Sequence, residues 1–507
     1  GQRVDNADLT PANEANTEFT VSLKPISEGT YLVSWRVLSS VDGHTTSGTF
    51  PFGVGVGELS AEAGSVSSSA TQPTPFSIGG RWLTLTGIVL LLGIFTFQLF
   101  VWQPLIGAVR LDEHEGRMTT IFLRRSLWFA VLCVGLIGVG LGLTFVSQNS
   151  QFDLLSGEYA RIWLGTQFGS MWFVRFGLTL VTAVYLLYLF RLGTGIPVWL
   201  WWAGVALASG LSLTVSLVSH SAALTAEDAL LALIVDYAHM LAAGVWVGGL
   251  LQLVLALWLV RRLTAKSRAW LNWGAVLNFA AAAATSVGVL LLSGGYLAWK
   301  HINSWTLLFG TAYGLTLVAK LGLIFPTLGI AVANLLVIKP RLEQALNDPE
   351  TPASQRWYGR LNSLTIIEAG FAVMVLAAAA YLTDLQRGLD APLLTNDPGK
   401  VLFEEQVDDL SVVLGLEPAL VGQNTFDVYL QDKNGRPVED AEEVFLRFTF
   451  LGQSMGVSTA EATHLGQGRY QAEGGYISLV GGWQVEVVIR RPGAFDTFAP
   501  FRMEAGL

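Results

Sequence analysis

Six histidines are the residues of this chain best suited to chemistry, because imidazole binds metals and transfers protons near neutral pH. His220, His239 and His301 lie inside or directly beside long apolar segments, whereas His44 and His464 lie in the polar ends of the chain. The first three all fall toward the same side of the apolar region. Chance would scatter them between both sides, so their distribution predicts a metal site on that side.

One pair of ionisable residues lies inside a single apolar segment. Asp236 precedes His239 by three positions, so both side chains share one face of a helix. An ionisable residue inside such a segment is a functional candidate by default. Imidazole with carboxylate suits Cu(II) or Zn(II), and imidazole also accepts Cu(I). Alternatively, Asp236 orients a histidine ring by accepting its other N–H, or Asp236 and His239 pair with each other to stabilise packing.

Further polar or soft side chains of the apolar segments are weaker candidates. Arg175 and Lys320 lie about two helical turns inside their segments. They could neutralise Asp236 or form a gate that repels cations, although basic side chains near helix ends commonly reach back to the interface. Glu368 is a candidate release site or proton carrier, with an internal hydrogen bond as the alternative. Met240 could offer a soft ligand to Cu(I), although most such methionines serve packing.

The elements that hold these residues are predicted to be membrane-spanning helices. The 507 residues are 52% hydrophobic and only 14% charged, where a globular domain carries about 25% charged residues. Eight continuous apolar runs can each cross about 30 Å of hydrocarbon as a helix of roughly 20 residues, and they lack the alternation of a β-barrel. In the fifth, Gly244 and Gly248 form a GxxxG step that predicts close helix packing. The runs are Trp82–Trp102, Leu127–Val146, Phe168–Phe190, Val198–Val218, Leu230–Val260, Ala275–Trp299, Tyr313–Ile338 and Leu364–Leu382.

Charge patterning predicts the orientation of these helices. The first, third, fifth and seventh connections between the runs hold thirteen Lys and Arg, and the other three hold only Arg161 and Lys300. Because basic loops stay in the cytoplasm, both termini and the three histidines of the apolar region are expected outside. No signal peptide is visible, which implies a leader that was removed or omitted. The single cysteine, Cys133, excludes an internal disulfide.

Both polar ends are predicted to be β-structure. Residues 1–56 hold two strand-like stretches, Phe19–Leu23 and Tyr31–Leu38, which amount to about half of a sandwich. Residues 400–507 hold five short strands separated by turn signals, which is typical of an immunoglobulin-like sandwich. These strands are Leu410–Leu414, Thr425–Gln431, Glu443–Phe450, Gly468–Ala472 and Trp483–Ile489.

A close resemblance to the C-terminal half of the copper-resistance C (CopC) β-sandwich covers residues 31–54, YLVSWRVLSSVDGHTTSGTFPFGV. It rests on a Tyr-x-Val-x-Trp-Arg strand, a Ser-x-x-Asp-Gly-His turn and a Gly-Thr-Phe-x-Phe-x-Val strand. In that family the Asp and the His of the turn help to bind Cu(II), which implies this role for Asp42 and His44. The turn alone is equally typical of an ordinary turn, and the family's first half, with its N-terminal histidine, is absent from the sequence.

Residues 78–385 resemble the copper-resistance D (CopD) membrane domain, a family associated with copper uptake or tolerance. Its matching signature consists of Ser219-His220-Ser221-Ala222-Ala223, Asp236-Tyr237-Ala238-His239 and Trp246-Val247-Gly248-Gly249-Leu250. Tyr313-Gly314, Lys320, Asn334 and Glu368 also recur at the expected places.

The tail resembles small YtkA-like β-domains that accompany copper proteins. The similarity runs through Asn434-Gly435-Arg436-Pro437-Val438, Gly468-Arg469-Tyr470 and Gly481-Gly482-Trp483. Such domains usually carry a Met-rich turn, and here only Met455 remains, with His464 nearby. Both are weak copper candidates beside a docking or structural role.

We therefore interpret the chain as an α-helical polytopic membrane protein with eight transmembrane helices and extracytoplasmic β-sandwich domains at both ends. We expect it to bind copper, as Cu(I) or Cu(II), and to transport it across the bacterial plasma membrane through an outer-side His/Asp site. The candidate metal ligands are His220, Asp236, His239 and His301, with Asp42 and His44 in the outer domain. The expected segments are a CopC-like part (1–56), a linker (57–77), a CopD-like domain (78–385), a second linker (386–399) and a YtkA-like domain (400–507).

Two other functions fit parts of the sequence. A haem-binding electron carrier would use two intramembrane histidines as axial ligands, but only His239 lies clearly inside a span. A non-transporting copper chaperone or accessory subunit of an oxidase-type membrane complex fits the acidic outer domains and the incomplete CopC module. No catalytic triad, phosphate-binding glycine loop or nucleotide motif is visible, so we expect neither an enzyme nor nucleic-acid binding.

Imidazole ligation predicts a pH dependence. Copper affinity of the detergent-purified protein should fall as the pH is lowered from about 8 to about 5, because protons compete with the metal for imidazole nitrogen. Equilibrium copper titrations at several pH values measure this. An affinity that stays flat over that range would contradict ligation by these histidines.

Overall fold

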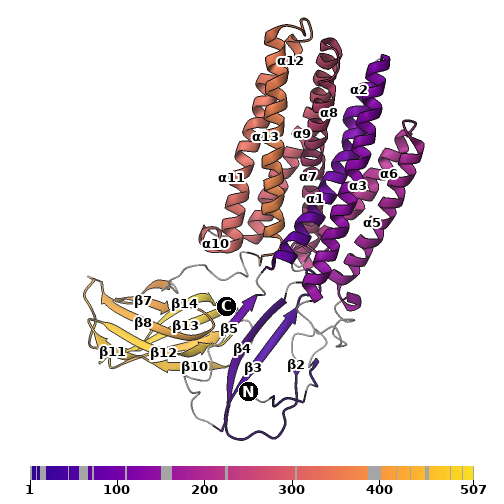
Figure 1. Ribbon diagram of the computed structural model, residues 1–507. Coiled ribbons are helices and arrows are strands. Elements are labelled where there is room, and N and C mark those ends of the chain that lie inside the picture. Colours follow the sequence, from indigo (N-terminus) through magenta and orange to yellow (C-terminus); the bar gives the residue numbers. More distant parts are fainter. Residues whose placement is uncertain are drawn as a thin grey trace. The chain divides into compact units, whose positions relative to one another are not determined.

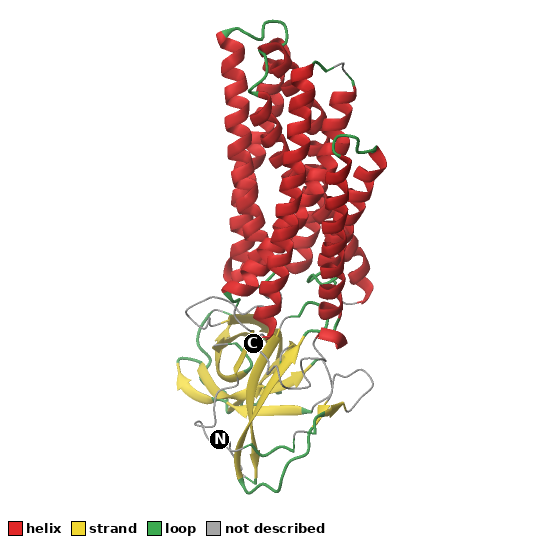
Figure 2. Ribbon diagram, turned by 45° about the vertical axis from the view of Figure 1, so that its right-hand side comes forward, coloured by secondary structure: helices red, strands yellow, loops and turns green. Residues whose placement is uncertain are grey.

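A computed structural model shows a helical unit and a β unit (Figure 1). The helical unit comprises residues 38–44 and 72–394, and the β unit comprises residues 1–37, 45–71 and 395–507. Figure 2 separates the helices from the strands by colour. The structure describes residues 3–6, 8–11, 19–43, 45–55, 67–70, 73–108, 111–149, 163–222, 226–302, 305–385, 387, 401–417, 419–433, 435–451, 456–479, 481–493 and 495–505.

Eight helices of the described residues are long and apolar enough to cross a membrane, as predicted. Several extend beyond the predicted runs because their polar ends continue the helix; α3 and α9 each have 37 residues, about 55 Å at 1.5 Å per residue. The spans are α1 (Pro75–Phe97) with η1 (Gln98–Trp102) and α2 (Gln103–Gly107); α3 (Glu113–Asn149); α5 (Gln167–Leu192); α6 (Val198–Ser216); α7 (Ala226–Ala243) with η2 (Gly244–Gly248) and α8 (Gly249–Val260); α9 (Ala265–His301); α11 (Ala312–Ala333) with η3 (Asn334–Ile338) and α12 (Lys339–Gln344); and α13 (Pro352–Leu382). A short helix, α10 (Trp305–Gly310), precedes α11.

Threonine side chains fix where five of these helices begin. Each threonine is an N-cap whose side chain accepts a hydrogen bond from the backbone N–H three residues later, which satisfies one of the free donors of the first turn. At α1 the cap is a capping box, in which the Ser77 hydroxyl lies within 2.9 Å of the Thr74 backbone nitrogen, and Pro75 takes the first helical position. The five caps are Thr74, Thr166, Thr264, Thr311 and Thr351.

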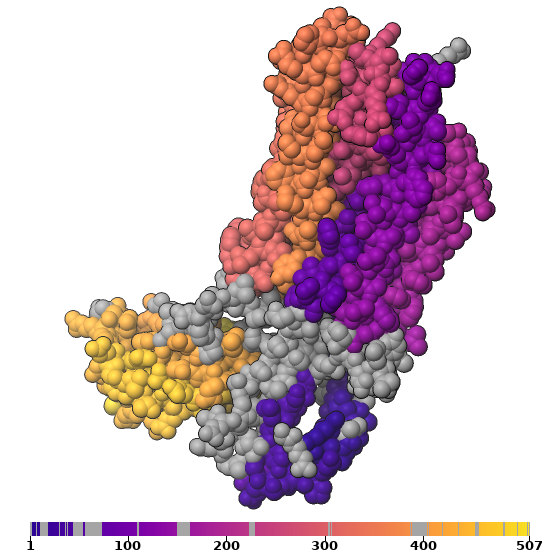
Figure 3. All heavy atoms as spheres, in the orientation of Figure 1, coloured from indigo at the N-terminus to yellow at the C-terminus, as the bar shows by residue number. Residues whose placement is uncertain are grey.

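Helix α1 forms the centre of the bundle. In its most apolar window 94% of the residues are buried, whereas no other span exceeds 61%. Close packing depends on small residues: a Cβ built on Gly93 would overlap the Cα of Gly248 in η2, and one built on Gly244 would press on Leu92. The predicted GxxxG step therefore serves helix packing. Helices α11 and α13 pack against each other, and Figure 3 shows the surface that this part of the chain presents, in orange tones.

An ion pair that the sequence analysis did not predict joins the first and last spans. Arg81 of α1 contacts the Asp384 carboxylate, with 2.8 Å between Nε and Oδ1, and its Nη1 donates to the Thr383 carbonyl at 2.8 Å. The Ser77 hydroxyl donates to the other Asp384 oxygen at 2.5 Å. Asp384 is buried, so the pairing compensates a charge that would otherwise be costly at this depth.

The N-terminal part of the chain is strand-rich but small. The strands β3 (Gly29–Leu38), β4 (Thr45–Val54) and β5 (Ser67–Ala70) form a sheet in that order, and β1 (Thr10–Pro11) pairs with β2 (Phe19–Thr20). The predicted strand at Tyr31–Leu38 corresponds to β3. Strand β5 lies within residues 57–77, the segment predicted as a linker, and it pairs with β4.

The C-terminal part is a sandwich of two antiparallel sheets, one ordered β11-β12-β8-β7-β6 and the other β10-β9-β13-β14. Their inner faces form one core, in which the Phe426 and Phe448 rings lie 4.9 Å apart. All five predicted strands are present, within β7, β8, β9, β12 and β13, and four further strands flank them. The strands are β6 (Val401–Val407), β7 (Leu410–Glu417), β8 (Gly422–Asp432), β9 (Glu443–Phe450), β10 (Val457–Glu461), β11 (Thr463–Gly466), β12 (Arg469–Ile477), β13 (Gly481–Arg490) and β14 (Thr497–Ala505).

The α1–η2 contact generates a stability prediction. Gly93→Ala should lower the free energy of unfolding by about 1–3 kcal/mol, because the added methyl group meets backbone that cannot swing aside. Thermal melting in detergent measures the loss. Gly295→Ala is the matched control, since a Cβ there meets nothing within 4 Å. Equal melting temperatures for both variants would contradict the contact.

Candidate metal centre

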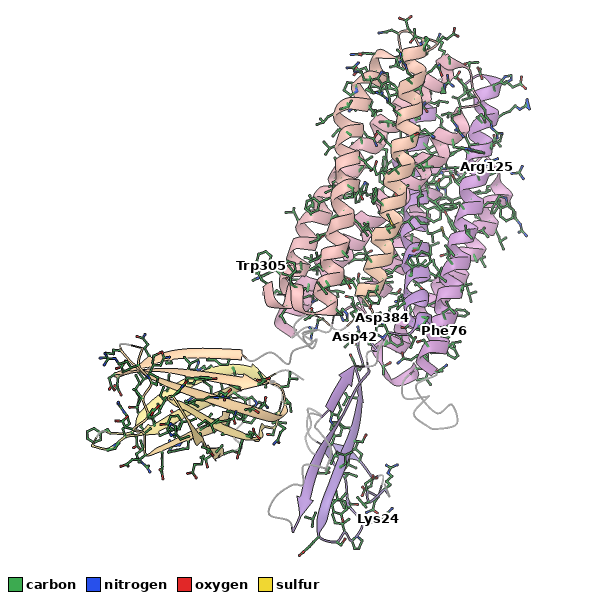
Figure 4. All side chains as sticks on the ribbon, turned by 60° about the vertical axis from the view of Figure 1, so that its left-hand side comes forward. Lys24, Asp42, Phe76, Arg125, Trp305 and Asp384 are labelled. Atoms are coloured by element: carbon green, nitrogen blue, oxygen red, sulfur yellow. The ribbon has the colours of Figure 1, made fainter. Side chains whose placement is uncertain are left out.

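The turn that follows β3 is held by the helical unit. The Phe168 backbone N–H at the start of α5 donates to the Ser40 carbonyl at 3.2 Å, and the Gln148 side chain donates to the Gly43 carbonyl at 3.5 Å. Gly43 has a φ of +73°, and a Cβ there would lie 2.8 Å from the Phe168 ring, so only glycine fits without strain. These contacts place the buried carboxyl of Asp42 against the helices (Figure 4).

The side chain of His220 contacts the Asp42 carboxyl. His220 follows the last residues of α6, and its Nδ1 lies 3.2 Å from Asp42 Oδ2. Both side chains are buried, with relative exposures of 9% and 7%. A carboxylate accepts from Nδ1–H, so this contact leaves the lone pair on Nε2, the arrangement in which a carboxylate orients a metal-binding histidine.

His301 and Tyr313 complete a three-ring group that we call the histidine cluster (His220, His301 and Tyr313). His301 is the last residue of α9, and Tyr313 lies in the first turn of α11. The ring centroids of the two histidines lie 6.3 Å apart. The ring centroid of Tyr313 lies 6.4 Å from that of His220 and 6.2 Å from that of His301. Within the described part of the chain, the buried Nδ1 of His301 has no hydrogen-bond partner.

The spacing of the two imidazole rings is compatible with a shared metal ion. With metal–nitrogen bonds of about 2 Å and ring nitrogens about 1.2 Å from the ring centre, two rings on opposite sides of one ion have centres up to about 6.4 Å apart. The orphaned Nδ1 of His301 is the kind of buried atom that an ion would satisfy. Among the residues that the structure describes, no three His, Cys, Asp or Glu side chains form a ready-made cage, so any further ligand must come from elsewhere.

Deeper in the bundle, His239 is oriented by α9 and not by Asp236. Its Nδ1 lies 2.8 Å from the Ser293 hydroxyl oxygen. That hydroxyl donates to the Val289 carbonyl at 2.5 Å, so its oxygen accepts from the imidazole N–H and leaves Nε2 as the ligand atom. Gly294 makes room for the ring, because a Cβ there would lie 3.4 Å from His239 Cε1.

Asp236 lies within electrostatic reach of His220 of the histidine cluster and of a partly buried lysine, Lys320. The hydroxyls of Ser216 and Ser219 are also close to its carboxyl. Neither hydroxyl has a hydrogen bond of normal geometry among the described residues. The carboxyl is therefore close to two elements that are far apart in the sequence, the loop after α6 and the third turn of α11.

The other predicted residues take separate places. Arg175 is buried and donates to the Thr214 side chain and carbonyl, at 2.8 and 2.6 Å, so it binds the end of α6. Glu368 accepts from the Asn334 side-chain amide at 3.0 Å and lines an apolar cavity of about 250 Å³. Met240 packs against the hydrophobic core.

Three predicted copper candidates remain: His464, His44 and Met455. The His464 ring stacks on Tyr470, with ring centroids 4.6 Å apart. His44 and Met455 lie outside the described residues.

Two functional neighbours were not predicted as site residues. Tyr313 was noticed only as part of a family motif, although it begins a span on the same side as the histidines. Ser293 gave no signal, because a serine inside a helix is ordinarily satisfied by the carbonyl one turn earlier.

Comparison with protein-family models finds three matches in order along the chain. Residues 1–55 match the CopC domain, residues 273–382 match copper resistance protein D, and residues 404–488 match the YtkA-like family. Among curated proteins, the copper transport protein CutJ of Bacillus subtilis (strain 168) is 26% identical over 494 residues, which covers 96% of this chain and 84% of that protein. Copper resistance protein D of Pseudomonas syringae pv. tomato is 26% identical over 333 residues, 62% of this chain and 98% of that protein.

No solved structure matches the chain significantly. The relatives are named for copper transport and copper resistance and not as enzymes. Three family segments in the predicted order, together with a relative that spans nearly the whole chain, agree with the resemblance found in the sequence. The chain therefore carries a CopC match, a copper resistance protein D match and a YtkA-like match in this order, and it is similar to a copper transport protein along nearly its whole length.

Proposed function

We propose that this protein binds copper at the histidine cluster and passes it into the helical bundle for transport across the bacterial plasma membrane. The observation that carries the proposal is the pair of facing imidazoles, His220 and His301, with an orphaned buried nitrogen on His301. The copper ion is cargo in this proposal, and the similarity to proteins named for copper transport and copper resistance supports the choice of metal.

Asp42 is a positioning residue in this proposal. Its carboxylate accepts from His220 Nδ1–H, holds the ring in one orientation and adds negative charge beside a bound cation. Because the CopC-like turn of residues 38–44 belongs to the helical unit, this turn and the membrane helices would hold the ion at one shared site. His44, two residues further along the same turn, is a further candidate ligand.

The pair formed by Asp236 and His239 is the proposed second station. Asp236 is within electrostatic reach of His220, so an ion leaving the cluster would meet a carboxylate next. His239 lies on the same helix face one turn further in and has Nε2 available. Lys320 balances the charge of Asp236 when no ion is bound, and an arriving cation would take over that role.

The proposed route also requires a particular orientation of the protein in the membrane. We propose that the histidine cluster and both termini face the outside, as the distribution of Lys and Arg among the connections predicts. Glu368, beyond Asp236 along the bundle, is then a candidate proton carrier on the inner side, and Arg175 stabilises α6.

The accessory role without transport is the second candidate. Two observations favour it: α1 and η2 touch backbone to backbone, and the cavity beside Glu368 is lined mostly by apolar side chains. Copper flux in proteoliposomes would select transport. Absence of flux together with co-purification of an oxidase would select the accessory role.

Removal of the facing imidazoles should abolish tight copper binding. The double variant His220→Ala/His301→Ala, purified in detergent, should retain less than about a tenth of the copper bound by the unchanged protein, because both ring ligands are lost. Metal analysis after dialysis measures this. His114→Ala, which removes an exposed imidazole from the first turn of α3, is the matched control. Copper content equal to the control would refute the site.

Replacement of the orienting carboxylate should weaken binding without removing it. Asp42→Asn keeps the side-chain shape but loses the charge, and we expect copper affinity to fall about 10–100-fold. Copper titration of the purified variant gives the affinity, and circular dichroism verifies the fold. Asp348→Asn, at an exposed residue in the turn before α13, should leave the affinity unchanged. An unchanged copper affinity of the Asp42→Asn variant would show that the turn does not contribute to the copper site.

A further inference from the structure

Three guanidinium groups gather around the indole ring of Trp258. The guanidinium carbon of Arg125 lies 4.8 Å from the ring centre, that of Arg262 lies 5.0 Å away and that of Arg261 lies 5.9 Å away. Arg125 belongs to α3, whereas Arg261 and Arg262 directly follow α8. We call these four residues the Arg–Trp cluster. It joins two helices that are far apart in the sequence.

The cluster carries positive charge that no acidic side chain balances. Within the part of the chain that the structure describes, none of its three arginines forms an ion pair with Asp or Glu. Contact with the indole face attracts each guanidinium but does not neutralise it. Any two guanidinium carbons lie at most about 11 Å apart, so their charges repel one another at this distance. An anion placed among them would remove that repulsion.

The position of the cluster indicates which anion is available. Trp258 lies two residues before the end of the span Ala229–Val260, where tryptophan side chains commonly sit at the level of the lipid headgroups. Figure 4 shows Arg125 toward the end of the helical unit opposite to Asp42. Beyond Arg125 on the same face of α3, Trp128 and Leu132 are 62% and 53% exposed and form an apolar stripe. A ligand with both a phosphate and an acyl chain matches this combination.

We propose that the Arg–Trp cluster binds the phosphate of an anionic phospholipid, whose acyl chain lies along Trp128 and Leu132 of α3. Guanidinium groups present paired N–H donors that fit phosphate oxygens, and several such contacts on one phosphate are stronger than isolated ones. The indole ring of Trp258 holds two of the donors close to its face and so reduces their freedom before the lipid binds. The lipid would connect α3 to the end of α8.

Lipid binding to the full-length protein tests this proposal. Native mass spectrometry of detergent-purified protein, titrated with phosphatidylglycerol or phosphatidylcholine, gives the affinity for each. The unchanged protein should prefer phosphatidylglycerol at least about tenfold, and Arg125→Gln/Arg262→Gln should lose that preference. The matched control, Arg124→Gln/Arg191→Gln, removes the same number of exposed charges from connections on the same side and should keep it.

Several outcomes would overturn the proposal. They are no preference for phosphatidylglycerol in the unchanged protein, an equal loss in both double variants, and displacement of the lipid by inorganic phosphate at the same concentration, which would indicate a site for the free anion. If circular dichroism shows that the double variant is misfolded, Arg262→Gln alone replaces it, and that variant should lose about threefold or more of the preference. Copper binding is independent of this cluster, so failure of either proposal leaves the other standing.

Discussion

The structure of the candidate site depends on one hydrogen bond, between Asp42 and His220, two residues that are 178 positions apart. A buried carboxylate is costly unless it is paired, and here the imidazole N–H supplies the pairing. The same contact fixes the ring that faces His301 and Tyr313. It also explains why the turn must hold its shape: Gly43 allows the backbone to bend against Phe168, and Asp42 is thereby brought to the end of α6.

The packing around α1 makes such a contact possible. Helices that approach closely enough for Gly93 to touch Gly248 leave little freedom in the relative rotation of the spans. Threonine caps fix the first residue of α5, α9, α11 and α13, and the Arg81–Asp384 pair ties the first span to the last. The loop after α6, the end of α9 and the start of α11 therefore occupy defined positions, which is what three facing rings require.

The sequence was sufficient for the spans and for the gathering of histidines toward one side, because both follow from hydropathy and loop charge along the chain. It could not specify which side chains hydrogen-bond to one another in the folded protein. The spacing of Asp236 and His239 allowed a pair on one helix face, yet His239 bonds to Ser293, since the rotation of α7 against α9 decides which group is nearer. Asp42 was assigned from the CopC turn alone. Strands β10 and β11 were missed because they are short and mostly polar, and β6 because charged residues interrupt it.

The imidazoles of His220 and His239 are oriented by different groups, and this difference affects how strongly each would hold an ion. The ring of His220 is oriented by a carboxylate, which makes the ring nitrogen more basic and adds negative charge near the metal. The ring of His239 is oriented by a neutral hydroxyl, and the nearby Asp236 shares its charge with Lys320. The charge available to a cation is therefore greater at the histidine cluster than at the inner pair. On the proposed route an ion would therefore bind first and most tightly at the cluster, and it would then meet the Asp236 carboxyl, whose charge Lys320 partly balances.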